Sequence, residues 1–178
     1  MNTIRVLQTP TGPFFILRHE DGAVETGWLE MADAMGPRSQ KELAQARRDD
    51  SIEENLAQRL RAAFDGDLVD FDDIETPPGT PFQRACWRST RAIPYGETRS
   101  YKELADMAGH PGAARAVGQA MRQNPLPIVV PCHRVVATSG LGGFGGQDTP
   151  GCRTSIKGHL LSVEGNQHIP ALNRAERL

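Results

Sequence analysis

The sequence predicts an α+β fold in two parts, a small antiparallel sheet with a helix followed by a mainly helical region. Short β-prone segments open the chain, while the later segments show helical periodicity between Gly and Pro breaks. The 178 residues are enough for one domain or two small ones. We expect a first domain at residues 1–75 and a second at residues 76–178.

Three segments near the N-terminus have the composition of strands. They read TIRVLQT, GPFFILRH and GAVETGWLE, and the Gly, Pro and Asp-Gly breaks between them favour an antiparallel meander. An amphipathic helix should follow, because apolar residues recur every four positions at Leu56, Leu60 and Phe64. The acidic segment 70–78 then ends in two prolines, which predicts an extended linker.

The second part has the pattern of a helix-turn-helix. The stretch PFQRACWRSTRAI predicts a helix that ends before Pro94. Ser100 and Glu103 form a capping box at the head of the next helix, SYKELADMA. A Gly-His-Pro-Gly break at residues 109–112 separates it from AARAVGQAMRQN, which Asn124 and Pro125 end.

The last of these helices is rich in very small side chains, at Ala113, Ala114, Ala116, Gly118 and Ala120. A surface with so little side chain could let a DNA duplex lie close to the backbone. It could equally be an ordinary tight contact between helices. The helix by itself favours the second interpretation.

Charge is divided unevenly along the chain. Residues 1–79 carry 8 Lys and Arg against 16 Asp and Glu, a net charge of −8, whereas residues 80–178 carry 12 against 6, a net charge of +6. The second part alone could therefore attract a phosphate backbone. The alternative is that the asymmetry keeps the two parts soluble or holds them together.

Hydropathy and cysteine usage predict a soluble protein of the cytoplasm, or of the nucleus in a eukaryote. No run of eighteen apolar residues occurs, and the N-terminal MNTIRVLQTP lacks the features of a signal peptide. The three cysteines have irregular spacing, which favours neither a disulfide framework nor a paired CxxC metal site.

Cys132 follows a short apolar stretch, PIVVP, that we interpret as a strand running through Pro131. A buried cysteine is usually inert packing. The following His133 raises a second possibility, because the thiolate is the nucleophile and forms with the help of a basic neighbour. Adjacent residues on a regular strand point to opposite faces. His133 therefore reaches the thiol only if the chain turns at Pro131 or if a water bridges the two groups.

Six motifs in order make the sequence resemble the O6-alkylguanine-DNA alkyltransferase family, also called methylated-DNA–protein-cysteine methyltransferases. They span residues 76–165 and read GTPFQRACW, IPYGETRSYKELA, AARAVGQAMRQNP, PIVVPCHRVV, SGLGGFGG and IKGHLLSVEG. The resemblance implies an RNase H-like N-terminal lobe and a helix-turn-helix, winged-helix-like C-terminal domain. It also implies a single, irreversible transfer of an alkyl group from O6-alkylguanine, and from O4-alkylthymine, in DNA to Cys132.

The resemblance implies a role for each residue of the reactive site. Cys132 is the alkyl acceptor, His133 is the base that ionises it through a bound water, and Glu164 is the carboxylate that orients His133. Asn124 holds the turn before the reactive segment. Tyr101 donates a proton or a hydrogen bond to the guanine ring as the alkyl group leaves.

Contacts with DNA are implied for the helix-turn-helix, which this family places in the minor groove. Arg115 enters the base stack in place of the extruded nucleotide, since chemistry at guanine O6 requires the base to leave the duplex. The other implied DNA contacts are Ala114, Ala116, Gly118, Arg122 and Ser100. The implied substrate pocket comprises Val135, Phe144, Gly145 and Lys157. For Lys157, a solvated helix lysine is an equally good interpretation.

Two loops differ in length from the family's pattern. The loop from Cys132 to Phe144 is one residue shorter, and the stretch between Gly146 and Ile156 is several residues longer, which leaves the equivalence of Phe144 and Gly145 open. Cys152 in the longer loop is read as incidental, with a second reactive thiol as the alternative. Cys86 is interpreted as core packing.

The implied partner is double-stranded DNA containing O6-alkylguanine, bound by a monomer with no cofactor, no metal and no membrane contact. Two other functions stay open. A lesion-binding alkyltransferase-like protein finds damage without transfer, although such relatives usually replace the acceptor cysteine. A thiol hydrolase could use Cys132, His133 and Glu164 on a small ester or amide, but it leaves Arg115 and the basic second part without a purpose.

Overall fold

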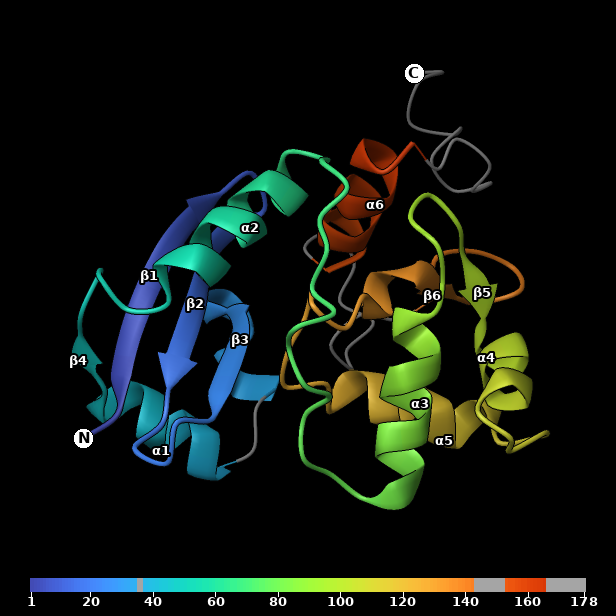
Figure 1. The fold of residues 1–178 in the computed structure, drawn as a ribbon. Coiled ribbons are helices and arrows are strands. Elements are labelled where there is room, and N and C mark those ends of the chain that lie inside the picture. Colours follow the sequence, from blue (N-terminus) through green and yellow to red (C-terminus); the bar gives the residue numbers. More distant parts are fainter. Residues whose placement is uncertain (35–36, 143–152, 166–178) are drawn as a thin grey trace. The chain divides into compact units, whose positions relative to one another are not determined.

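Two compact units make up the chain in the computed structural model, which describes residues 1–34, 37–142 and 153–165 (Figure 1). The first unit is Met1–Val69 together with Pro125–Pro127. The second is Asp70–Asn124 together with the described residues from Ile128 onward. The change of unit after Val69 lies a few residues before the boundary that the sequence indicates.

The first unit is built on a mixed sheet in the order β3-β2-β1-β4. Strands β1 (Thr3–Thr9), β2 (Gly12–Arg18) and β3 (Val24–Trp28) pair antiparallel, so the predicted meander is confirmed. The short β4 (Arg47–Arg48) adds to β1 in parallel. The sequence did not indicate β4, the 3₁₀ helix η1 (Leu29–Ala34) or helix α1 (Pro37–Gln45).

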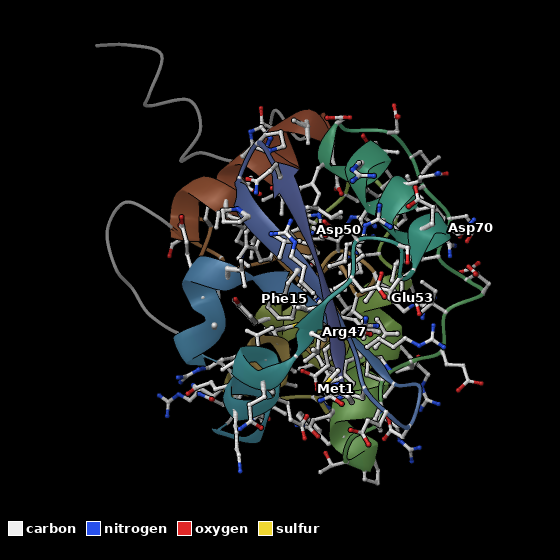
Figure 2. The ribbon with its side chains drawn as sticks, turned by 90° about the vertical axis from the view of Figure 1, so that its left-hand side faces the viewer. Met1, Phe15, Arg47, Asp50, Glu53 and Asp70 are labelled. Atoms are coloured by element: carbon white, nitrogen blue, oxygen red, sulfur yellow. The ribbon has the colours of Figure 1, made fainter. Side chains whose placement is uncertain are left out.

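Helix α2 (Glu54–Phe64), which the four-residue apolar spacing predicts, lies along the sheet (Figure 1). Its Phe64 ring meets Phe14 of β2 and Trp28 of β3 edge to face, with centroids 5.1 and 6.0 Å away. Phe14 and the next three residues of β2 are completely buried. Charged residues gather outside this core, where Figure 2 labels Arg47, Asp50 and Glu53.

The edge strand β3 holds a distant piece of chain within the first unit. The amide of Thr26 donates to the carbonyl of Pro125 at 2.9 Å, and its hydroxyl donates to the carbonyl of Pro127 at 3.1 Å. Both donors belong to Thr26, so the strand fixes both ends of a three-residue segment that closely precedes Cys132.

The second unit contains helices α3 (Pro81–Arg91), α4 (Tyr101–Met107), α5 (Ala114–Arg122) and α6 (Arg153–Val163). The helices predicted for α3, α4 and α5 are confirmed. So is the Ser100 capping box, in which Ser100 accepts from the Glu103 amide at 3.1 Å while the Glu103 carboxylate accepts from the Ser100 amide at 2.7 Å. Positive φ angles at Gly109 and Gly112, 78° and 85°, form the turn between α4 and α5.

A short parallel pair of strands completes the second unit, with Arg99 of β5 (Arg99–Ser100) opposite Val135 of β6 (Val135–Val136). Among the described residues, no helix is long and apolar enough to cross a membrane.

We expect Phe64→Ala to lower the free energy of unfolding of the first unit by about 3–5 kcal/mol, because it removes a buried ring from an aromatic cluster that cannot close the gap. Urea unfolding measures this loss. The matched control is Leu68→Ala, since Leu68 is 76% exposed and should change stability little. Equal losses in the two variants would contradict the packing described for α2.

Candidate active site

Cys132 lies in a turn and not on a strand. The expectation of a strand running through Pro131 is wrong, because Cys132–Arg134 form a single 3₁₀ turn, η2, directly after Pro131. The turn is closed by the amide of Arg134, which donates to the carbonyl of Pro131 at 2.9 Å. The chain does turn at Pro131, but His133 Nδ1 has no hydrogen-bond partner among the described residues, so the turn alone does not join the ring to the thiol.

The Cys132 thiol is buried, and burial raises its pKa. A hydrogen bond from the Asn124 side chain and the positive charge of Lys157 act in the opposite direction, as do the backbone amides of Cys132 and His133. The Asn124 amide nitrogen also donates to the carbonyl of Val130 at 2.9 Å. Asn124 thus braces the loop across six residues and also interacts with the thiol.

His133 and Glu164 are joined by a short hydrogen bond, as the resemblance implies. The distance from His133 Nε2 to Glu164 Oε1 is 2.8 Å, and both side chains are more than nine-tenths buried. Burial lowers the pKa of His133, and Glu164 partly opposes this effect. The other ring nitrogen, Nδ1, is buried without a hydrogen-bond partner among the described residues. A neutral His133 with its proton on Nε2 therefore keeps Nδ1 available to accept a proton.

Arg134 completes this pair, and sequence reasoning did not assign it a role. Its Nε donates to Glu164 Oε2 at 3.0 Å, and one terminal nitrogen donates to Oε1 at 2.9 Å. Burial works to raise the pKa of Glu164, but the hydrogen bonds from His133 and Arg134 prevail and lower it to about 2. Glu164 is accordingly an ionised carboxylate that accepts from both residues. The adjacency of His133 and Arg134 in PCHRV was the signal available in the sequence.

Lys157 on α6 is completely buried, so the interpretation as a solvated lysine is wrong. Its amine donates to the carbonyl of Val135 at 2.5 Å and lies 5.7 Å from the centre of the Tyr101 ring. Burial lowers the pKa of Lys157 to about 8, against the opposing influence of the Cys132 thiolate. The amine therefore brings a cation close to Cys132 and Tyr101 near neutral pH.

Tyr101 is brought to the site by the β5–β6 pair. Ser100 lies opposite Val136 in the ladder, and the α4 helix starts at the next residue, Tyr101. Because β6 directly follows η2, this pairing places the head of α4 beside the strand that leaves the reactive turn. The Tyr101 ring is partly buried.

The small residues of α5 divide between two faces. Val117, Ala120 and Met121 are buried, with helical spacing, and the Ala120 carbonyl accepts from the Trp87 indole at 2.9 Å. Ala120 hence packs inside, which fits the helix–helix contact that the sequence offered as one of two interpretations of these small residues. Arg115, Ala116 and Arg122 are exposed, and Ala114 and Gly118 are partly exposed. Ser100 is buried and engaged in its capping box.

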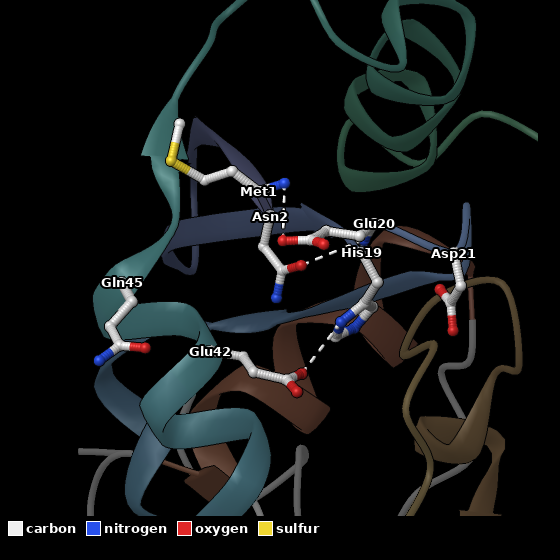
Figure 3. Close-up of a pocket in the computed structure, with 7 residues that line it drawn as sticks. All are labelled: Met1, Asn2, His19, Glu20, Asp21, Glu42 and Gln45. Carbon is white, nitrogen blue, oxygen red and sulfur yellow. Dashed lines mark hydrogen bonds and ion pairs between the residues drawn. The ribbon is translucent and has the colours of Figure 1, made fainter.

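Three residues considered from the sequence, Phe144, Gly145 and Cys152, lie outside the described residues. Cys86 is completely buried and its pKa is raised by burial, in keeping with core packing. A cavity of about 500 Å³ occurs elsewhere, in the first unit, where His19 contacts Glu42 (Figure 3). None of the residues expected in the reactive site lines it.

Residues 81–166 match the family model described as "6-O-methylguanine DNA methyltransferase, DNA binding domain". The methylated-DNA–protein-cysteine methyltransferase of Mycobacterium leprae is 43% identical over 169 residues, covering 94% of this chain and 95% of that one. This chain belongs to the methylated-DNA–protein-cysteine methyltransferase family.

Solved structures of the methyltransferase family agree with this assignment. The O6-methylguanine methyltransferase of Mycobacterium tuberculosis has a TM-score of 0.75 at 36% identity, with 96% of each chain covered. A Mycobacterium tuberculosis protein solved in complex with DNA has a TM-score of 0.73 at 37% identity, covering 91% of this chain and 92% of the other. The predicted α+β fold, with a small sheet followed by a helical region, is confirmed.

Lys157→Met should change how stability depends on pH. The pKa of Lys157 is about 8 in the folded protein and ordinarily 10.5, so between these pH values the unfolded chain binds more protons than the folded one. The buried, charged amine therefore destabilises the fold at pH values below this window. Relative to the Met variant, the parent should therefore gain about 3 kcal/mol as the pH rises through that interval.

Urea unfolding at several pH values measures this gain, in a Cys132→Ser background that removes titration of the neighbouring thiol. The matched control is Lys102→Met on the exposed side of α4. A pH dependence no steeper for Lys157→Met than for Lys102→Met would contradict a buried, titrating amine.

Proposed function

We propose that this protein repairs DNA by taking the alkyl group of O6-alkylguanine onto Cys132, once and irreversibly. The observation that carries the proposal is the buried Cys132 thiol, which directly precedes a histidine held by an ionised carboxylate at 2.8 Å. This arrangement has the order of a Cys-His-acid triad. Membership of the family supplies the substrate class, and O4-alkylthymine is a second substrate of the same chemistry.

The transfer balances with groups on the protein. The thiol S–H bond breaks and its proton passes to Nδ1 of His133, with a water as the bridge implied by the family. The sulfur attacks the alkyl carbon, the bond from that carbon to guanine O6 breaks, and the guanine ring takes up a proton. In net terms, the thiol proton ends on guanine. Tyr101 assists at the ring, so that a neutral base leaves instead of an anion.

The raised thiol pKa explains why a base is part of the site. Because burial raises the pKa of the thiol, Cys132 stays protonated and unreactive until a base removes its proton. Attack would then follow once a substrate is bound. Lys157 would stabilise the thiolate as it forms, since its charge acts on Cys132. The product is a thioether, whose sulfur is a poor leaving group from an alkyl carbon. The acceptor is therefore consumed.

Duplex DNA is the proposed partner of a monomeric protein, with the second unit as its binding part and α5 in the minor groove. Arg115 would fill the place of the extruded nucleotide, and Ala114, Ala116, Gly118 and Arg122 would line the contact. Ser100, which is buried, would act there only by capping α4. Phe144 and Gly145 are proposed, with Val135, to form the base pocket. The net charge of +6 on residues 80–178 favours the phosphate backbone.

Intact mass spectrometry tests the transfer. Incubation with duplex DNA containing O6-methylguanine should add the mass of one methylene to the peptide with Cys132, in a one-to-one ratio with the lesions repaired. Cys132→Ser should gain no mass. Restoration of more than one guanine per protein molecule would contradict a consumed acceptor, and lesion binding without any mass gain would favour the lesion-binding alternative.

Gly118→Ala should separate the needs of the fold from the needs of DNA binding. An added Cβ at Gly118 meets no atom within 4 Å outside the helix's own backbone, and Ala stabilises a helix interior by about 0.5–1 kcal/mol over Gly. The variant should therefore unfold at a higher temperature. It should also react several-fold more slowly with duplex DNA if the phosphate backbone approaches α5 closely.

Reaction with free O6-benzylguanine is the internal control and should be unchanged in Gly118→Ala. Arg115→Ala, at an exposed position of the same helix, should lose duplex repair more strongly and also keep the free-base reaction. Equal losses with duplex and free base in both variants would exclude α5 as the DNA-binding surface.

A further inference from the structure

The guanidinium of Arg134 forms several hydrogen bonds beside the reactive turn. Its Nε and one terminal nitrogen grip both oxygens of Glu164, at 3.0 and 2.9 Å. The other terminal nitrogen donates to the carbonyl of Ile93 at 2.9 Å. The fork geometry matches a carboxylate and cannot be reproduced by an ammonium group.

A second contact fixes the guanidinium from its face. Arg134 Cζ lies 5.7 Å from the centre of the Tyr95 ring, and the Tyr95 hydroxyl donates to the carbonyl of Val163 at 3.3 Å. Val163 ends α6, and Glu164 follows it. Tyr95 and Arg134 thus reach the same end of α6 by two routes, which holds the Glu164 carboxylate in one position.

We propose that Arg134 is a positioning residue that holds Glu164 as an ionised acceptor and thereby keeps His133 neutral, with its proton on Nε2, until Cys132 reacts. This inference rests on the alkyl transfer proposed above, for which His133 is the base. His133 Nε2 and a terminal nitrogen of Arg134 share the same oxygen, Glu164 Oε1. A carboxylate whose negative charge is balanced by a guanidinium stabilises a protonated histidine less than an unpaired carboxylate would.

The charges that face His133 support this direction. Burial lowers the pKa of His133, Glu164 acts to raise it, and the charges of Arg134 and Lys157 lower it further. Cys132, the remaining titratable neighbour, is a neutral thiol before reaction because burial raises its pKa. Loss of Arg134 would leave Glu164 to attract a proton onto the imidazole. An imidazolium has no lone pair to accept the thiol proton.

An NMR titration tests this without any reaction. Long-range ¹H–¹⁵N spectra of the His133 ring report its tautomer and protonation, in the full chain carrying Cys132→Ser. We expect the Nε2–H tautomer in the parent, and Arg134→Met should move protonation of His133 to higher pH by about one unit. The control is Arg91→Met, because Arg91 is equally buried, at 15% side-chain exposure, and bonds the carbonyls of Phe71 and Ile74 instead.

The consequence for reactivity is measured with O6-benzylguanine between about pH 5 and 9, with Cys132 intact, a range that spans the ordinary His pKa. Arg134→Met should shift the acid limb of the rate profile to higher pH by about one pH unit. At a given pH on that limb, the rate should fall roughly tenfold. Arg134→Lys keeps the charge without the fork and should shift the limb less, which keeps the test valid if the Met variant folds poorly. In a Glu164→Gln background, Arg134→Met should cause a smaller shift, because only the direct repulsion between Arg134 and His133 is then lost.

A rate lowered equally at every pH, a His133 titration unmoved by Arg134→Met, or an equal movement in Arg91→Met would overturn the role of Arg134. Failure of the proposed alkyl transfer would look different. All variants, including the parent, would then fail to gain the benzyl group, while the NMR titration would still decide what Arg134 does to His133.

Discussion

Burial of the Cys132 thiol is the constraint on which the rest of the site depends. An apolar setting raises the pKa of the thiol, so the nucleophile must be made at the moment of use. That requirement explains a neutral His133 with a vacant Nδ1 and a Glu164 that remains ionised. It also explains a lysine amine that is completely buried nearby, at considerable cost in solvation.

The backbone conformation before and within the reactive turn positions Cys132 and His133. A regular strand would place the consecutive residues Cys132 and His133 on opposite faces. Here both residues instead belong to the 3₁₀ turn that follows Pro131. Before the turn, Asn124 ties the chain to Val130, and Thr26 holds Pro125 and Pro127 by two hydrogen bonds. The sheet of the first unit thus fixes part of the loop that leads to the acceptor.

The proposed DNA surface and the reactive turn make different demands on the same unit. On α5, the face with Val117 and Met121 serves the core, whereas Arg115 and Arg122 are exposed. Gly118 stands at a position where alanine would fit and stabilise the helix. Around η2, the polar side chains are largely buried and bonded to one another or to backbone carbonyls. An exposed surface suits a partner that must arrive and leave, and a buried network suits groups that must hold one geometry.

Local chemistry in the sequence determined the strands β1 to β3, the helices α2 to α5 and the Ser100 capping box, because each depends on neighbours within a few residues. The motif order and PCHRV also pointed to Cys132, His133 and Glu164. Only the tertiary structure decided that Lys157 is buried, that Ala120 faces inward and that the chain turns at Pro131. Arg134 and Glu164 are thirty residues apart in the sequence, and they meet because α6 packs on the reactive turn. Such a contact leaves no periodic signal in the sequence.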